Sequence, residues 1–459
     1  MAKSRENRGS AVVWFRRDLR VMDNPALDYA IREGYEVIPI YVESNQNAQH
    51  WQPGAASRWW CYQSLKSLAD SLQQQNLTLR FFYADPKQII RKIIKQTGAT
   101  LICWNTLYEP AAQALECDLI QILKGIDIQR FDSHLLFTPG TVLNKQGDPY
   151  RVFTPFWKTA RQQLEVSGVN LTKTKRYKRT AVERITLKGE CKLDGLGLLD
   201  SHLWHKKLEQ HWSPGEMNAQ KRLRHFIKKY VSSYEVDRDI PSIEGTSKLS
   251  PHLHFGEITP AQIYYQLQQA DYKPGIQNNI ERFISELGWR EFAHHVLWHF
   301  PATCDQAMNQ TFKRFWPNKA NQRLLVAWQK GQTGIPLVDA GMRQLWETGW
   351  MHGRVRMVVG SFLTKNLGIH WLQGARWFWD TLVDADLANN TMGWQWVAGC
   401  GVDAAPYYRI FNPETQAKRF DPSNDYLQHW LPKGGHLSGS PLVDLKESRA
   451  KALLRYKKL

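Results

Sequence analysis

The stretch AVVWFRRDLR, residues 11–20, decides how the first part of the chain folds, because an apolar run stops abruptly at a cluster of charges. A short continuous apolar run is typical of a strand that a parallel sheet buries on both faces. Further short runs rich in residues that favour strands lie at Val37 to Val42, Leu79 to Tyr83, Leu101 to Asn105 and Ile128 to Phe131. The sequence therefore predicts five strands within residues 1–135, the first of them at Ala11 to Phe15.

Amphipathic stretches separate these runs, and several open with the residues that begin helices. They lie at Asn24 to Glu33, Ala55 to Gln75, Pro86 to Thr97 and Pro110 to Lys124. Alternation of strands and helices predicts a doubly wound, Rossmann-like parallel sheet. No GxGxxG follows the first strand and no GxxxxGK[ST] occurs in the sequence, so neither glycine-rich fingerprint supports a nucleotide in this domain.

The pattern changes twice further along the chain. Residues 136–215 lose their periodicity and are predicted to form a partly irregular connector. Within it, residues 173–192 are strongly basic, which favours a solvated face, with a DNA-approach surface as the alternative. After Gly215 the pattern is almost wholly helical, so the expected fold class is α/β followed by all-α.

Composition restricts the function classes. The 459 residues include 60 Lys and Arg against 43 Asp and Glu, a formal charge of +17 that suggests a polyanionic partner. Six scattered cysteines with no metal-ligand spacing suggest a reducing cytoplasm and no structural zinc. The polar N-terminus and the lack of a long apolar run predict a soluble protein.

The chain carries 20 tryptophans, and 11 of them fall between Trp289 and Trp396. Any single one is most simply a large core residue. As a group, they could relay an electron or stack on bases. Within the same region, Glu286, Trp289 and Arg290 share one stripe of a predicted helix, Asn279 to Phe300, either as an ordinary surface ion pair or beside an indole that stacks on a base.

Each of two further segments could either bind a ligand or form an ordinary cap or turn. Gly245 to Pro251 combines hydroxyl side chains with Lys248 before a Ser-Pro helix start, which suits a phosphate cradle or an ordinary cap. The run from Asp384 to Asn390 concentrates carboxylates and carboxamides, which suits a polar ligand such as a flavin ring or a capped turn.

Taken together, these segments resemble the photolyase/cryptochrome family, in particular the class I-like microbial photolyases of cyclobutane pyrimidine dimers. The resemblance rests on VVWFRRDLR (12–20), residues 245–251, 286–292, 350–357 and 384–396, RIFNP (409–413) and VDLK (443–446). It implies an α/β antenna domain over 1–135, a connector over 136–215 and a helical FAD-binding domain over 216–459. It also implies a cytoplasmic monomer that binds UV-damaged DNA and neither a metal nor a membrane.

The resemblance implies a non-covalent FAD, active when fully reduced. The residues that would hold it are Tyr234, Thr246, Ser247, Lys248, Leu249, Ser250, Phe283, Arg356, Asp384, Asp386 and Asn390. Arg356 and Asp384 would form an ion pair, and Asn390 would face flavin N5. A chain of three indoles, Trp394, Trp371 and Trp316, would reduce the flavin from the surface inward.

In the implied reaction, light-excited reduced FAD passes an electron to a flipped-out dimer, the cyclobutane ring splits, and the electron returns. Trp289 and Trp396 would flank the dimer, and Glu286 would hydrogen-bond one of its bases. The other positions at which the family contacts DNA are Arg238, Arg290, Gly353, Arg354, Met357, Arg409 and Gln416.

Two departures from the family pattern bear on function. Gly353 stands where cyclobutane-dimer photolyases usually carry an asparagine; we expect repair to survive, with a cryptochrome-type photoreceptor as the chief alternative. A (6-4) photolyase, which has a second histidine at this position beside His352, and a light-independent DNA-binding protein rank lower. Ala111 and Ala112 replace the Asn and Glu of folate-binding relatives, which argues against a typical folate antenna and leaves the second chromophore open.

Overall fold

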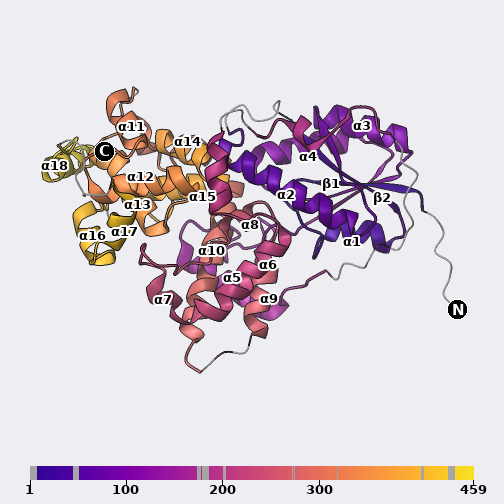
Figure 1. The fold of residues 1–459 in the computed structure, drawn as a ribbon, viewed down its shortest axis with the longest axis horizontal. Coiled ribbons are helices and arrows are strands. Elements are labelled where there is room, and N and C mark those ends of the chain that lie inside the picture. The colour runs from indigo at the N-terminus through magenta and orange to yellow at the C-terminus, as the bar shows by residue number, and fades with distance from the viewer. Residues whose placement is uncertain are drawn as a thin grey trace.

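The computed structural model describes residues 8–44, 51–172, 177, 186–199, 203–270, 272, 274–317, 319–404, 408–432 and 440–459. A sheet flanked by helices forms one end of the molecule, and a larger assembly of helices forms the other (Figure 1). Most of the basic run at 173–192 lies outside the described residues; Lys188 and Lys192 lie within them.

The predicted strands form one parallel sheet, which confirms the predicted fold class. They are β1 (Ser10–Phe15), β2 (Glu36–Glu43), β3 (Arg80–Tyr83), β4 (Leu101–Asn105) and β5 (Asp127–Phe131). Their spatial order is β5-β4-β1-β2-β3-β6, where β6 (Glu190–Cys191) comes from the connector and pairs antiparallel with β3. The sequence pattern did not predict this edge strand.

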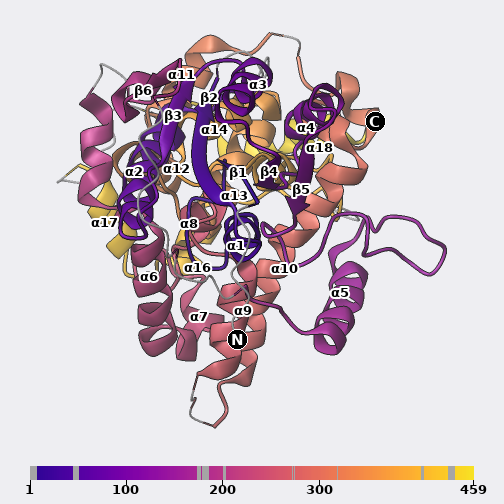
Figure 2. The same cartoon turned by 90° about the vertical axis from the view of Figure 1, so that its right-hand side faces the viewer.

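Helices cover both faces of the sheet (Figure 2). They are α1 (Pro25–Arg32), α2 (Ala55–Gln73), α3 (Pro86–Thr97) and α4 (Pro110–Ile122). Because successive strand residues point to opposite faces, Val13 packs in the core with α1 and α2, whereas Val12 packs in the core with α3 and α4. The continuous apolar run in β1 is thereby explained.

The charged residues that follow β1 are buried between the sheet and the helical part. The Arg20 side chain is 1% exposed and donates to the Gly256 carbonyl at 3.0 Å, while the Leu19 amide donates to the Phe255 carbonyl at 3.0 Å. Gly256 has φ +64°, and a Cβ there would lie 2.1 Å from the Arg17 carbonyl oxygen. This close approach requires glycine.

The connector is more regular than its sequence pattern predicted. It contains α5 (Phe153–Ser167), the strand β6 and two 3₁₀ segments, Leu193–Leu196 and Leu203–Gln210. Helix α5 packs against α10 (Gln277–His299) of the helical part, while β6 extends the sheet. The connector therefore contacts both ends of the molecule.

The helical part is built around a large aromatic core that includes Trp316, Trp328, Trp371 and Trp394. Its remaining helices are α6 (Glu216–Lys229), α7 (Tyr234–Asp237), α8 (Ser250–His254), α9 (Pro260–Gln269), α11 (Gln322–Gln329), α12 (Pro336–Thr348), α13 (Gly353–Ser361), α14 (Trp371–Thr381), α15 (Leu387–Ala398), α16 (Pro413–Phe420), α17 (Asp425–Trp430) and α18 (Leu445–Tyr456).

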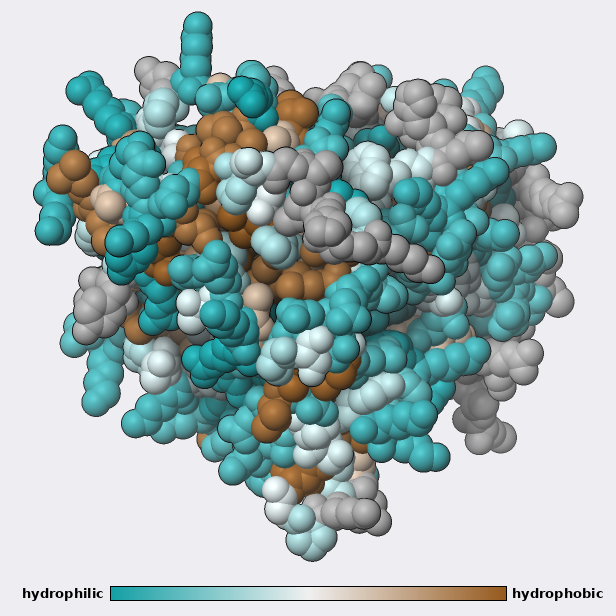
Figure 3. Space-filling view, turned by 60° about the vertical axis from the view of Figure 1, so that its left-hand side comes forward, coloured by the Kyte–Doolittle hydropathy of each residue, from teal (hydrophilic) through white to brown (hydrophobic). Residues whose placement is uncertain are grey.

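The surface of the molecule carries both hydrophilic and apolar side chains. On the face drawn in Figure 3, hydrophilic side chains predominate and apolar ones show between them in separate patches. Among the residues that the structure describes, no helix has the combination of length and apolar character that a bilayer span requires.

Candidate flavin and DNA site

A cavity of about 530 Å³ opens in the helical part, which is within the range of sites for small molecules and cofactors. Its walls come mainly from α10, α13, α14 and α15 and from the segment that follows α15. The predicted site residues that line it are Arg238, Glu286, Trp289, Arg354, Arg356, Met357, Asp384, Asp386, Asn390, Trp394, Trp396 and Arg409. Segments far apart in the sequence therefore meet in one cavity.

The ion pair expected between Arg356 and Asp384 is formed. The guanidinium Nη2 lies 3.1 and 3.0 Å from the two carboxylate oxygens, and the Asp384 side chain is only 4% exposed. Arg356 Nε also donates to the Met351 carbonyl at 2.7 Å, and Ser250 Oγ donates to Asp384 at 2.7 Å. The pair thus links α8, α13 and the segment before α15 at the wall of the cavity.

The segment before α8 brings a second cation close to this ion pair. Lys248 has φ +51°, an unusual backbone conformation for a residue other than glycine. Its Nζ lies 5.5 Å from the centre of the Trp350 ring, and the Arg356 guanidinium lies 5.9 Å from the same ring. Burial lowers the pKa of Lys248, the effect expected of an ammonium group short of counter-charge.

Other residues expected to hold FAD are not among the residues that line this cavity: Tyr234, Phe283, Thr246, Ser247 and Leu249. Tyr234 and Phe283 pack edge to face in the core at 5.1 Å between ring centres. The Ser247 carbonyl accepts a hydrogen bond of 2.8 Å from Arg222 Nε. Thr246 is half-buried and Leu249 is buried.

Asp386 caps α15, with one carboxylate oxygen accepting from the Asn389 amide at 2.9 Å. The other oxygen lies 3.4 Å from His254 Nδ1 and 3.6 Å from His294 Nε2. Burial on its own would raise the pKa of Asp386, but His294, His254 and Arg290 together hold it well below its usual range. Asp386 is therefore an anion in a buried polar cluster.

The prediction that Arg290 contacts DNA is wrong for this structure. Arg290 is 8% exposed and donates to the His134 carbonyl at 2.9 Å, and its Nη2 lies 2.8 Å from His134 Nε2. It also does not pair with Glu286, which contacts Arg238 and Arg282 instead. Arg290 joins the helical part to the segment that follows β5.

Within the described residues, one group has the donors for a metal ion: His134, His294 and Asp386, whose ligand atoms lie within 4.8 Å of one another. The Arg290 guanidinium already hydrogen-bonds His134 Nε2 within this group. A side-chain cation thus already neutralises this cluster.

Asn390 lies on the cavity wall and is 9% exposed. Its Nδ2 donates to the Ala375 carbonyl at 3.0 Å, so a neighbouring helix fixes the orientation of the carboxamide.

The three indoles predicted to relay electrons are all buried. Trp394 borders the cavity, whereas Trp371 and Trp316 lie deeper in the aromatic core. The His370 ring lies between the last two, 5.0 Å from Trp316 and 5.8 Å from Trp371. Trp316 is only 4% exposed, so it does not itself form the surface end that the prediction assigned to it.

Four predicted substrate residues line the cavity and are half-buried, and together they define its mouth: Glu286, Trp289, Met357 and Trp396. Glu286 forms a close ion pair with Arg238, and Arg354 pairs with Asp239 at 2.5 Å. Arg409 is exposed at the rim. Gln416, on α16, is half-buried and does not belong to the cavity lining.

Gly353 begins α13 and is exposed. A Cβ built there meets nothing within 4 Å in the described part of the chain, so the position has room for a larger side chain. The preceding His352 caps the helix, its Nδ1 accepting from the Arg354 amide at 3.2 Å. Burial lowers the pKa of His352 to about 4, which keeps the imidazole neutral at physiological pH.

Several residues of the cavity lining were not predicted from the sequence, among them Arg282, Phe378, Leu382, Met392 and Val402. Arg282 precedes Glu286 by one helical turn, and this spacing could have revealed it. The apolar residues gave no such signal, because core helices contain the same types.

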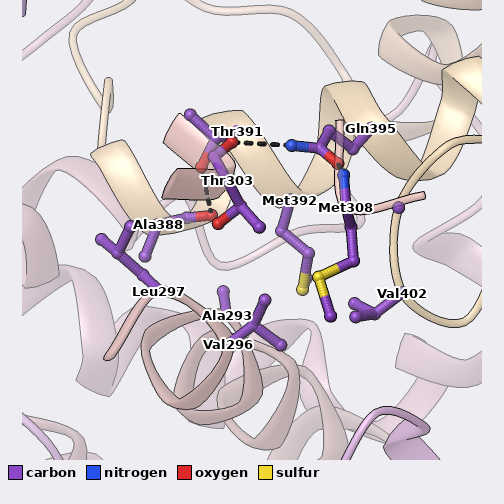
Figure 4. A pocket seen from close by; sticks show the side chains of 11 residues that line it. Ala293, Val296, Leu297, Thr303, Met308, Ala388, Thr391, Met392, Gln395 and Val402 are labelled. Carbon is purple, nitrogen blue, oxygen red and sulfur yellow. Dashed lines mark hydrogen bonds between the residues drawn. The ribbon is translucent and has the colours of Figure 1, made fainter. Parts of the chain in front are cut away.

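A small hollow of about 10 Å³ lies beside the cavity, between α10 and α15, and the side chains of Met308 and Met392 point into it (Figure 4). Gln395 closes one side by donating to the Thr303 and Gln306 carbonyls at 2.6 and 2.9 Å and accepting from the Met308 amide at 2.8 Å. The hollow has room for about one water molecule, so it is a packing feature.

Two side chains of the segment that would bind a folate antenna form contacts with other parts of this chain. Tyr108 donates to Asp132 at 2.5 Å, and Glu109 pairs with Arg17 at 2.7 Å.

Comparisons with known proteins agree with this geometry. Residues 11–176 match the family described as DNA photolyase, and residues 283–458 match the family described as FAD binding domain of DNA photolyase. A deoxyribodipyrimidine photo-lyase of Agrobacterium fabrum is 41% identical over 92% of this chain and 87% of its own. Cryptochrome-2 of Arabidopsis thaliana is 35% identical over 97% of this chain and 76% of its own.

Among solved structures, a bacterial class III photolyase from Agrobacterium tumefaciens superposes with a TM-score of 0.89 at 38% identity, over 98% of this chain and 97% of its own. A cryptochrome of Synechocystis sp. PCC6803 superposes with a TM-score of 0.86 at 27% identity, over 98% of both chains. This chain therefore belongs to the photolyase/cryptochrome family.

Proposed function

We propose that this protein repairs DNA with light, splitting cyclobutane pyrimidine dimers with bound, fully reduced FAD. The observation that carries the proposal is that one cavity holds the Arg356–Asp384 ion pair on its wall and Glu286, Trp289 and Trp396 near its mouth. A cofactor and an aromatic substrate could thus meet within a single space.

The residues present fit FAD. The volume is suitable, and Arg356 lines the cavity. Lys248 contacts the same Trp350 ring as Arg356, and the two cations would neutralise a diphosphate. The match of residues 283–458 to the FAD-binding family supports the same cofactor. Bound FAD would supply the light-excited electron that opens the dimer.

The mouth residues would bind a dimer flipped out of the duplex, since the lesion cannot reach the cavity while it is stacked. Trp289 and Trp396 would provide apolar walls for the two bases. Glu286 is held in place by Arg238 and would hydrogen-bond a base edge. Arg354 and Arg409 would contact phosphates, which fixes the position of the strand without reading its sequence.

Trp394, Trp371 and Trp316 would resupply electrons to an oxidised flavin. Indole side chains suit this role because they are oxidisable, and their burial excludes water from the route. Asn390, which Ala375 orients, would face the reactive edge of the flavin.

A cryptochrome-type photoreceptor is the second candidate. The specific observation in its favour is Gly353, which places no carboxamide beside the lesion site. The family itself contains both activities, so the fold does not choose between them.

The deciding experiment is repair of defined lesions by the photoreduced protein, followed as recovery of thymine absorbance from cyclobutane and (6-4) substrates. Repair of the cyclobutane lesion alone is expected. Failure of the native chain together with repair by Gly353→Asn would overturn the proposal and favour the photoreceptor. Release of the chromophores by denaturation, followed by absorption spectroscopy, would identify any antenna.

A further inference from the structure

An aromatic stack connects the connector to the cavity mouth. The rings of Phe153 and Trp289 lie face to face, 3.7 Å between centres and 10° between planes. Trp157, one turn further along α5, lies behind Phe153 at 6.3 Å and 12°. Gly288 allows this arrangement, because a Cβ there would lie 2.6 Å from the Trp157 ring.

Phe153 is also linked, through Asp403, to Trp396, a second indole of the cavity lining. Burial raises the pKa of the Asp403 carboxyl, and a hydrogen bond from the backbone N–H of Phe153 to the carboxylate opposes this rise. The Asp403 carbonyl, in turn, accepts from Trp396 Nε1 at 3.1 Å. Asp403 has φ +54°, and this backbone conformation turns its carbonyl and its carboxylate toward different partners.

We propose that Phe153 and Asp403 are positioning residues that fix the Trp289 and Trp396 walls of the lesion site. Phe153 sets the plane of one indole by stacking, and Asp403 anchors the other by its hydrogen bond while holding the start of α5. The inference rests on the proposed function, since it assigns the gap between the two indoles to a flipped pyrimidine dimer.

Packing alone does not account for this arrangement. A buried aromatic pair normally adopts an edge-to-face or offset geometry, as Phe156 and Phe292 do with a 46° tilt at 5.2 Å in the same cluster. Phe153 instead lies almost parallel to an indole that borders an open cavity. Because the stack with Phe153 already fixes the plane of the Trp289 indole, a further flat ring can stack on this indole without the cost of ordering it. Such preorganisation strengthens binding.

The test compares Phe153→Leu with Phe156→Leu, a matched loss of an aromatic ring three residues along the same helix. Phe156 is 2% exposed and packs on Phe292 rather than on Trp289. Phe153→Leu is expected to weaken binding to dimer-containing DNA about 3- to 10-fold relative to undamaged DNA, the effect of losing one aromatic pair. Phe156→Leu should leave this ratio unchanged, and Phe153→Tyr should restore it.

Asp403 is tested by Asp403→Gly against Asp403→Asn. Glycine tolerates the left-handed backbone but lacks the acceptor for Phe153, whereas asparagine keeps both. We expect lower lesion preference in the glycine variant and a near-native ratio in the asparagine variant. Flavin content and flavin photoreduction should be native in all these variants, because neither residue lines the cavity described above.

A measurement without DNA separates this inference from the proposed function. In protein labelled with fluorotryptophan, the fluorine resonance of Trp289, assigned with Trp289→Phe, should shift or broaden in Phe153→Leu and not in Phe156→Leu. If the native protein shows no lesion preference, the proposed function fails. If Phe153→Leu keeps the native lesion preference or the native Trp289 resonance, the positioning role is refuted.

Discussion

Replacing Gly374 by alanine should displace Trp394, the indole that borders the cavity. Gly374 lies within α14, and a Cβ there would lie 2.1, 2.4 and 2.6 Å from three atoms of the Trp394 ring. Since ordinary contacts begin near 3.4 Å, the ring would have to retreat by about 1 Å in a close-packed core.

The energetic cost follows from two opposing effects. Overpacking a core costs about 1–3 kcal/mol, whereas alanine gains roughly 0.5–1 kcal/mol over glycine inside a helix. The free energy of unfolding should therefore fall by about 1–2 kcal/mol. Because Trp394 also borders the cavity, the ring has space to move into, toward the position assigned to the flavin.

The assay combines denaturant unfolding with flavin content and the rate of photoreduction by an external donor. We expect reduced FAD occupancy and at least severalfold slower photoreduction. Gly353→Ala is the matched control for these readouts, because its new Cβ meets nothing within 4 Å in the described structure. If the Gly374→Ala protein is stable and its photoreduction is native, Trp394 does not lie between Gly374 and the flavin position.

Three further predictions concern charge. Burial raises the pKa of Glu291 from 4.5 to about 7, so the unfolded chain releases this proton first and stability falls as pH rises between these values. Glu291→Gln keeps the acceptor for the Leu136 and Phe137 amides and should remove that loss, about 3 kcal/mol by pH 8, measured by denaturant unfolding across this pH range. Asp384→Asn removes the charge paired with Arg356, and FAD affinity, measured by equilibrium dialysis, should fall by at least tenfold; unchanged affinity would refute the assigned role. Binding to damaged DNA should weaken steeply with salt, and neutralising Arg409 should reduce the slope by about one, whereas neutralising the buried Arg290 should lower stability instead.

The sheet could be predicted from sequence because its signal is local. Each strand is a short run of residues that favour strands, and Asn24 and Asp85 cap the following helices as their positions suggest. The strand β6 could not be predicted, because two residues carry no period and their partner, β3, lies more than a hundred residues away.

The candidate site likewise contains residues whose place could be predicted from the sequence and residues whose place could not. Residues that share a motif, such as Asp384 and Asn390, reach the cavity as the resemblance implied. Arg290 does not, because α10 is packed against α5, α7 and α15 and has little exposed face. Its partner His134 lies 156 residues earlier, so spacing within the helix could not reveal where the guanidinium points. Phe153 was missed for the same reason.

The burial of Arg20 has a consequence for how the chain is made. One of its two acceptors is the carbonyl of nearby Asp23, whereas the other, the Gly256 carbonyl, lies 236 residues further along the chain. During synthesis the sheet leaves the ribosome first, and domains generally fold in that order. Until the helices that follow have emerged, the loop after β1 has no cover and its guanidinium remains in water. The earliest strand to be translated thus reaches its final surroundings only after more than half of the polypeptide has been made.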